Sequence, residues 1–276
     1  MHQSILVYRS FRYLKWAAGL TLASIIAYAV HQPNFPPNGG TWLGYTLGTI
    51  GALLILWLMW FGVRKRRYNE GKVRLEDWLS AHVYMGLALI VIATLHTGFQ
   101  FHWNLHTLAF GLMVVVIVSG MFGVFAYLRY PQLMTANRRG QTLRQLMMTI
   151  AEVDTECREI AVKLGDKVNK LVLDAAENTR IGGSMWRQLS GNDPNCATER
   201  ALGQIRSEVR ADATATVKDE SRLIVLLGRK SELLKRARRD VQLKALMDVW
   251  LYAHVPLSFA LLAALTTHVI SVFFYL

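Results

Sequence analysis

The chain has 276 residues, of which 53% are hydrophobic and only 18% are charged, so it is more apolar than an ordinary soluble domain. Its formal net charge is +12, but no nucleic-acid-binding motif accompanies that charge, and a nucleic-acid partner is not expected. No Cys-x-x-Cys-His sequence occurs, which argues against a covalently attached c-type haem.

Five uncharged stretches near 20 residues in length predict transmembrane helices. They lie roughly at 16–34, 42–63, 78–99, 106–128 and 249–275. The first also has the basic start and the small residues of a signal peptide, but we interpret it as a retained helix. The predicted fold is all-α: an integral membrane bundle of five transmembrane helices with one cytoplasmic helical insert. The expected parts are 1–41, 42–130, the insert 131–246, and 247–276.

The distribution of charge predicts the orientation of this bundle. The segments 31–41 and 98–107 and the tail after Thr267 contain no charged residue, whereas the loop after the second helix contains the basic run 64–67. The positive-inside rule then places the N-terminus and residues 129–247 in the cytoplasm of a bacterium. The C-terminus is expected in the periplasm, and the protein in the inner membrane.

Helical periodicity predicts a helical hairpin in the insert. Apolar residues recur at helical spacing over about 139–177 and again over 197–246, and the glycine-rich stretch 178–195 predicts a loop between them. Pro131 is expected to end or kink the fourth helix. The second half of the insert is expected to run directly into the fifth helix.

Four histidines lie inside the predicted helices, where a polar ring is costly without a role. His82 and His96 lie on the third helix, 14 residues apart, and His254 and His268 lie on the fifth with the same spacing. Fourteen residues bring two rings within roughly 40° of one helix face and about 21 Å apart along the axis. Because the two helices run in the same direction, His82 is expected to face His254 near the inner surface. His96 is expected to face His268 near the outer surface.

Two neutral imidazoles on facing helices can bind one haem iron from both sides. The inner pair and the outer pair, here called the inner and outer levels, therefore predict two b-type haems. One alternative is that these are ordinary buried histidines bonded to carbonyl groups. A metal-ion site is a second alternative. It is disfavoured because the two pairs lie too far apart to share one ion, and because no carboxylate or thiol joins either pair.

Glycines and two further histidines give weaker signals. The second and fourth helices contain glycines that have two possible explanations: a flat macrocycle approaches the backbone closely, or the helices simply pack together. These glycines are Gly48, Gly62, Gly111 and Gly123. His102 and His106 lie in and near the short outer loop. They could exchange a proton with a quinone, or they could be ordinary interfacial histidines.

This pattern resembles known haem proteins. The paired histidines on two helices with one helix between them, and the spaced glycines of the second helix, are similar to the haem core of cytochrome b in bc complexes. The arrangement also resembles the membrane domain of ferric reductases and NADPH oxidases. The run from Leu251 to Phe259 resembles bacterial cytochrome b-like proteins. The insert, and the absence of the glutamate-containing quinol-oxidation signature, depart from these families.

We therefore expect transmembrane electron transfer through two bis-histidine haem b groups, in the membrane subunit of a respiratory or redox complex. No flavin, nicotinamide or iron–sulfur motif is present, so electrons are expected from quinol or from a partner such as a multihaem cytochrome c or an iron–sulfur protein. Whether the chain is itself an enzyme stays open. One alternative is a transmembrane reductase of ferric ion, oxygen or a periplasmic cytochrome. Another is a haem-free anchor or signalling protein that acts through its insert.

A basic cluster precedes the fifth helix. It fits contact with anionic lipid, and it also fits a docking surface for an acidic electron carrier or partner subunit. Its members are Arg229, Lys230, Lys235, Arg236, Arg238 and Arg239.

Overall fold

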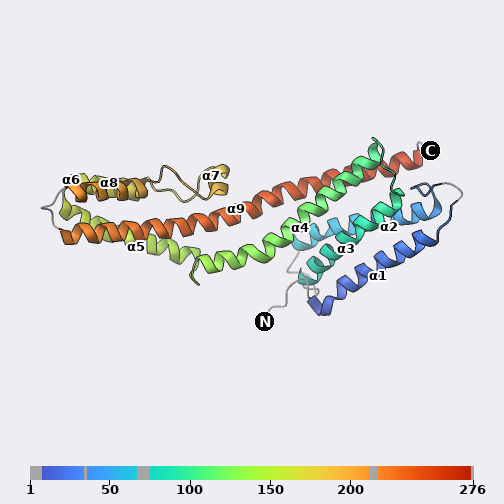
Figure 1. The fold of residues 1–276 in the computed structure, drawn as a ribbon, viewed down its shortest axis with the longest axis horizontal. Helices are drawn as coiled ribbons and strands as arrows, with labels where there is room; N and C mark the ends of the chain where they lie inside the picture. The colour runs from blue at the N-terminus through green and yellow to red at the C-terminus, as the bar shows by residue number, and fades with distance from the viewer. Residues whose placement is uncertain (1–7, 34–35, 67–74, 212–216, 275–276) are drawn as a thin grey trace. The chain divides into compact units, whose positions relative to one another are not determined.

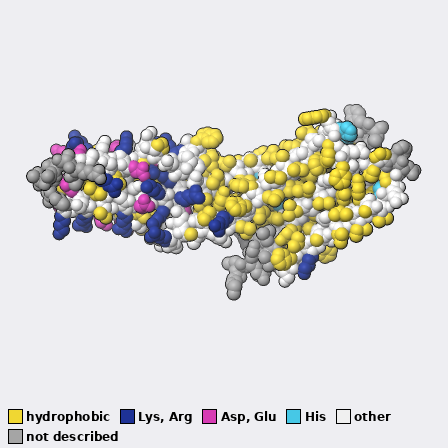
Figure 2. Space-filling view, in the orientation of Figure 1, with side chains coloured by type: hydrophobic (Ala, Val, Ile, Leu, Met, Phe, Trp, Pro, Cys, Tyr) yellow, Lys and Arg dark blue, Asp and Glu magenta, His cyan; other side chains and the backbone are white. Residues whose placement is uncertain are grey.

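The computed structural model describes residues 8–33, 36–66, 75–211 and 217–274, and all regular secondary structure in these ranges is helical. The chain divides into two compact units. The first unit comprises residues 1–125 and 250–276, and the second comprises residues 126–249. Figure 2 shows hydrophobic side chains over much of the first unit, whereas Lys, Arg, Asp and Glu gather over the second.

Within the described ranges, five helices are long and apolar enough to cross a membrane, which confirms the prediction of a multi-pass, all-helical membrane protein. Each contains a candidate span of at least 21 residues, which meets the roughly 20 residues that a bilayer core of about 30 Å requires. They are α1 (Tyr8–Val30), α2 (Trp42–Arg66), α3 (Leu75–Thr97), α4 (Leu105–Asn137) and α9 (Val217–Phe274).

Two apolar clusters hold the helices of the first unit together. α3 packs against both α1 and α2, and the three helices run side by side (Figure 1). Leu47 of α2 and Ile92 of α3 are buried in the cluster between them. A second cluster brings together Ile55, Leu89, Met113 and Leu261, which come from α2, α3, α4 and α9. The four helices that the sequence predicts around the cofactors therefore share one packed core.

Two of the long helices contain a proline. α4 continues through Pro131 to Asn137, so this proline does not end the helix. α9 contains Pro256 and runs without interruption from Val217 to Phe274, which confirms that the second half of the insert continues into the fifth transmembrane helix.

The second unit contains more helices than the predicted hairpin. Its first half holds α5 (Leu143–Ala161), a short 3-10 helix (Val162–Leu164) and α6 (Asp166–Glu177), and its second half holds α8 (Ala197–Ala211) before α9. Gly165 separates the first two α-helices with a φ of 100°, a conformation that glycine adopts readily, so the chain can turn there. The predicted loop 178–195 also contains a short helix, α7 (Met185–Ser190).

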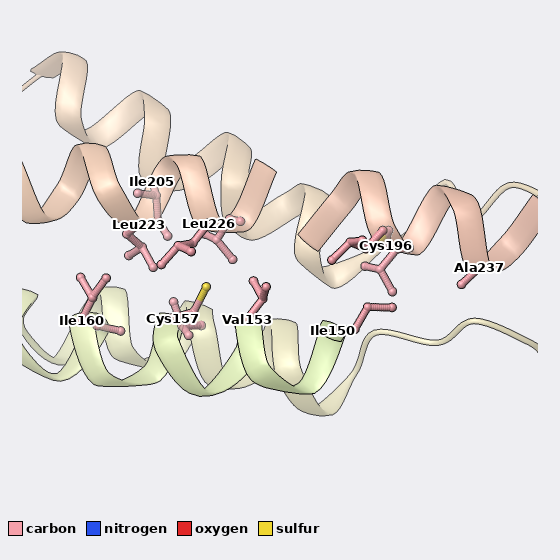
Figure 3. Close-up of a cluster of buried hydrophobic side chains, with 14 of the residues drawn as sticks. Ile150, Val153, Cys157, Ile160, Cys196, Ile205, Leu223, Leu226 and Ala237 are labelled. Carbon is pink, nitrogen blue, oxygen red and sulfur yellow. The ribbon is translucent and has the colours of Figure 1, made fainter. Parts of the chain in front are cut away.

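Apolar side chains of α5 and α9 face each other in the core of the second unit (Figure 3). Val153 and Cys157 of α5 and Leu223 of α9 are almost fully buried there. Burial, with a smaller effect from the Asp154 carboxylate, raises the pKa of the Cys157 thiol to about 12. Because the thiolate is the reactive form, Cys157 is a packing residue and not a nucleophile.

Two members of the basic cluster lie inside the second unit. Lys230 is 1% exposed, and its Nζ lies 2.5 Å from Asp154 Oδ1 and donates to the carbonyl of Ala175 at 2.8 Å. Arg238 is also buried; it donates to the carbonyl of Arg180 and pairs with a carboxylate at 3.3 Å. These two cations therefore form buried ion pairs and hydrogen bonds within the second unit. Only the other members of the cluster can contact a lipid or a partner protein.

Candidate functional site

The outer histidine of α3 is held by the first turn of α2. His96 is partly buried, and its Nδ1 lies 2.8 Å from the carbonyl oxygen of Gly44. A carbonyl can only accept, so a neutral His96 donates through Nδ1 and keeps the lone pair on Nε2. This arrangement, with one ring nitrogen held by the backbone and the other free, is typical of a metal-binding histidine.

Gly48 allows the His96 ring to approach α2. A Cβ added at Gly48 would lie 2.7 Å from Cε1 and 2.9 Å from Nδ1 of His96, and a Cβ at Gly39 would lie 3.2 Å from Cε1. The close neighbour of Gly48 in this structure is thus an imidazole. Likewise, the indole of Trp250 occupies the space where a side chain on Gly123 would be. Close approach of a haem to these glycines stays a prediction.

We expect Gly48→Ala to destabilise the first unit by about 1–3 kcal/mol, because the new methyl group must displace the His96 ring or α2. Thermal unfolding in detergent measures the loss. Gly62→Ala is the matched control on the same helix, since an added Cβ there meets no described atom within 4 Å. A Gly48→Ala protein as stable as this control would show that the His96 ring moves away at no cost.

Three histidines meet at the outer level. The ring centroids of His96 and His268 lie 6.1 Å apart, so the structure brings together the predicted outer pair from α3 and α9. His106 of α4 also contacts His268, with 2.5 Å between their Nδ1 atoms. One of these two nitrogens must donate and the other must accept. His102 is exposed in the turn before α4, where its backbone N–H donates to Thr107.

The inner histidine of α9 is held in the same way as His96. Ser119 Oγ donates to the carbonyl of Val116 at 2.8 Å. His254 Nδ1 lies 2.7 Å from this Ser119 Oγ. Because the one hydroxyl proton goes to the Val116 carbonyl in this arrangement, a neutral His254 donates through Nδ1 and keeps its lone pair on Nε2. The Trp250 ring stacks on His254 with 5.3 Å between centroids, and its Nε1 donates to the carbonyl of Ser119 at 2.7 Å.

The inner histidine of α3 lies among apolar and aromatic groups and beside the backbone of Leu58. His82 contacts the ring of Phe61 on α2, with 5.0 Å between centroids, and it is near enough to His254 for the two rings to interact electrostatically. Its Nδ1 is buried and has no hydrogen-bond partner in the part of the chain that the structure describes. Such an atom is rare in a native protein, because an unsatisfied buried polar group costs about 1–3 kcal/mol.

Three partners of the histidines were not predicted from the sequence. Ser119 carries a signal, since it is a polar residue within an apolar helix. Trp250 precedes His254 by four residues, a spacing that places both rings on one face of a helix. The contact of His106 with His268 has no sequence signal, because nothing in the spacing relates the start of α4 to the end of α9.

Among the described residues, no group of three His, Cys, Asp or Glu side chains is placed to hold a metal ion. Comparison with family models, with curated proteins and with solved structures finds no match to this chain. The histidine geometry is therefore the basis for a functional proposal.

Proposed function

We propose that this chain is a transmembrane electron carrier that holds two haem b groups between α3 and α9. His82 and His254 would bind one iron, and His96 and His268 would bind the other. A porphyrin supplies four of the six ligands of a haem iron, so a level with two imidazoles completes the set without a third protein ligand. The single observation that carries the proposal is the pairing of His96 with His268.

The spacing and the hydrogen bonds of the rings support this assignment. Metal–nitrogen bonds of about 2 Å on both sides of one iron put two imidazole centroids roughly 6 Å apart, and the centroids of His96 and His268 are separated by 6.1 Å. His96 and His254 each keep the Nε2 lone pair that a metal needs. The unpartnered Nδ1 of His82 gives the inner level a polar atom that a ligand would satisfy.

The residues around the rings have defined tasks in this proposal. Hydrogen bonds that His96 donates to the Gly44 carbonyl and His254 donates to Ser119 would fix the tautomer and the orientation of these two ligands and raise their basicity. The core around Leu89 and Met113 excludes water between the two levels. Haem supplies the one-electron redox chemistry, and the protein sets its position, ligation and potential.

Donor and acceptor belong to the same proposal. The sequence contains no flavin or iron–sulfur motif, so electrons enter from quinol or from a partner subunit. The protein lies in a bacterial inner membrane with the second unit in the cytoplasm, as the distribution of Lys and Arg indicates. Because His106 is bonded to His268, its task is to hold this ligand, and proton exchange with quinone is a weaker interpretation.

Haem content tests the proposal directly. We expect the full-length protein, purified in detergent from cells that synthesise haem, to contain two haems b per chain by the pyridine haemochrome assay. A protein that is folded but free of haem would overturn the proposal and favour the membrane anchor. Oxidation of a quinol analogue, compared with reduction of ferric chelates, then separates a quinone-linked carrier from a transmembrane reductase.

A further inference from the structure

A cavity of about 350 Å³ lies in the second unit, between the turn after α4, the start of α5 and the surface of α9. Its volume is within the range of about 300–1,000 Å³ that small-molecule sites occupy. We call it the arginine pocket, because three arginines line it. Its polar lining residues are Arg139, Gln141, Thr149, Arg229, Glu232 and Arg236.

The three arginines of the pocket differ from other basic residues of the same unit. Arg138, Lys230 and Arg238 each form an ion pair with an aspartate. Arg139, Arg229 and Arg236 form no ion pair with a carboxylate in the part of the chain that the structure describes. The pocket therefore has three cationic groups against the one carboxylate of Glu232, which itself pairs with Lys235 at 3.6 Å.

Helix geometry and a turn bring these cations to one place. Arg229 and Arg236 are seven residues apart on α9, which is about two turns, so they share one face of the helix. Arg139 follows α4 with a φ of 52°, a left-handed conformation that is uncommon for residues other than glycine. The buried side chain of Leu233 gives the pocket an apolar wall on α9.

We propose that the arginine pocket binds an anion of the phosphate class, either a soluble phosphate compound or the phosphate of a lipid headgroup. A guanidinium group presents several N–H donors in a planar fork that matches phosphate oxygens, and three such groups surround the cavity. The side chains of Gln141 and Thr149 can add neutral hydrogen bonds. This site is independent of electron transfer, because none of its residues belongs to the histidine levels.

Calorimetric titration of inorganic pyrophosphate into the full-length protein, in detergent and in phosphatidylcholine nanodiscs, tests the proposal. We expect saturable binding to the original protein that weakens at least about tenfold in Arg229→Ala and in Arg236→Ala, since each removes charged hydrogen bonds. Glu232→Gln should bind more tightly, because it removes the negative charge from the pocket. Arg222→Ala, an exposed arginine of α9 outside the pocket, is the matched control and should bind as the original does.

Two outcomes would overturn the proposal: no binding heat with the original protein, or equal weakening by Arg222→Ala and by the pocket variants. Thermal unfolding without pyrophosphate confirms that each variant is folded. Nanodiscs that contain phosphatidylglycerol identify the source of the phosphate. Loss of pyrophosphate binding in these nanodiscs assigns the pocket to the lipid headgroup, and retained binding assigns it to a soluble anion.

Discussion

Replacing His82 or His254 with alanine should give a protein that binds one haem in place of two. Each substitution removes one of the two imidazoles at the inner level, and an iron with a single axial ligand is held far less firmly. The outer pair lies about 21 Å further along the helices, so its haem should remain. The pyridine haemochrome assay measures the loss, and a redox titration should show one midpoint potential where the original protein shows two.

Matched substitutions separate ligation from general damage to the fold. His102→Ala removes an exposed histidine of the outer turn and should keep both haems. His96→Ala should remove the other haem, so its remaining potential should be the one that His82→Ala lacks. If His82→Ala and His254→Ala each retained two haems, the proposed inner pair would be wrong, whatever the spectrum of the original protein.

Asp154→Ala should destabilise the second unit by about 3–5 kcal/mol, the usual cost of leaving one member of a buried ion pair without its partner. Lys230 is 1% exposed, and without Asp154 its ammonium group would keep only the carbonyl of Ala175. In a unit of this size, such a loss lowers the melting temperature by roughly 10–20 °C. Differential scanning calorimetry of the full-length protein in detergent measures the shift.

A surface ion pair on the same helix provides the comparison. Lys235 is mostly exposed and pairs with Glu199 at 3.7 Å and with Glu232 at 3.6 Å. Lys235→Ala should change the free energy of unfolding by less than about 1 kcal/mol, because water screens such pairs. Equal melting temperatures for Asp154→Ala and Lys235→Ala would show that Lys230 is hydrated and not buried.

The transmembrane helices and the placement of the histidines could be predicted because both depend on local patterns. An uncharged stretch near 20 residues has few alternatives to a membrane helix, and a spacing of 14 residues fixes which ring positions share a face. His96 and His268 therefore meet in the structure as the sequence suggested. The run of α9 from the insert into the membrane was also predictable, since no proline or glycine-rich turn lies between Arg229 and His254.

The second unit could be predicted less well, because its details depend on contacts between distant segments. Lys230 and Arg238 belong to a basic stretch that looks solvated, yet both find aspartates far away in the sequence and are buried. Pro131 was expected to end or kink α4; the helix continues beyond it to Asn137, so it does not end there, and the kink stays a prediction. Similarly, the partners of the histidine rings, such as Ser119 and His106, are set by packing among helices and not by sequence spacing.

Pro256 makes the two histidine levels mechanically unequal. It lies two residues after His254 and has no N–H, so the carbonyl of Tyr252 loses its usual donor within α9. Nearby, Ser258 Oγ donates to the carbonyl of His254 at 2.8 Å, a bond that often bends helices. The helical turn that carries His254 therefore lacks one backbone hydrogen bond of a regular helix, whereas no proline interrupts the turns around His268.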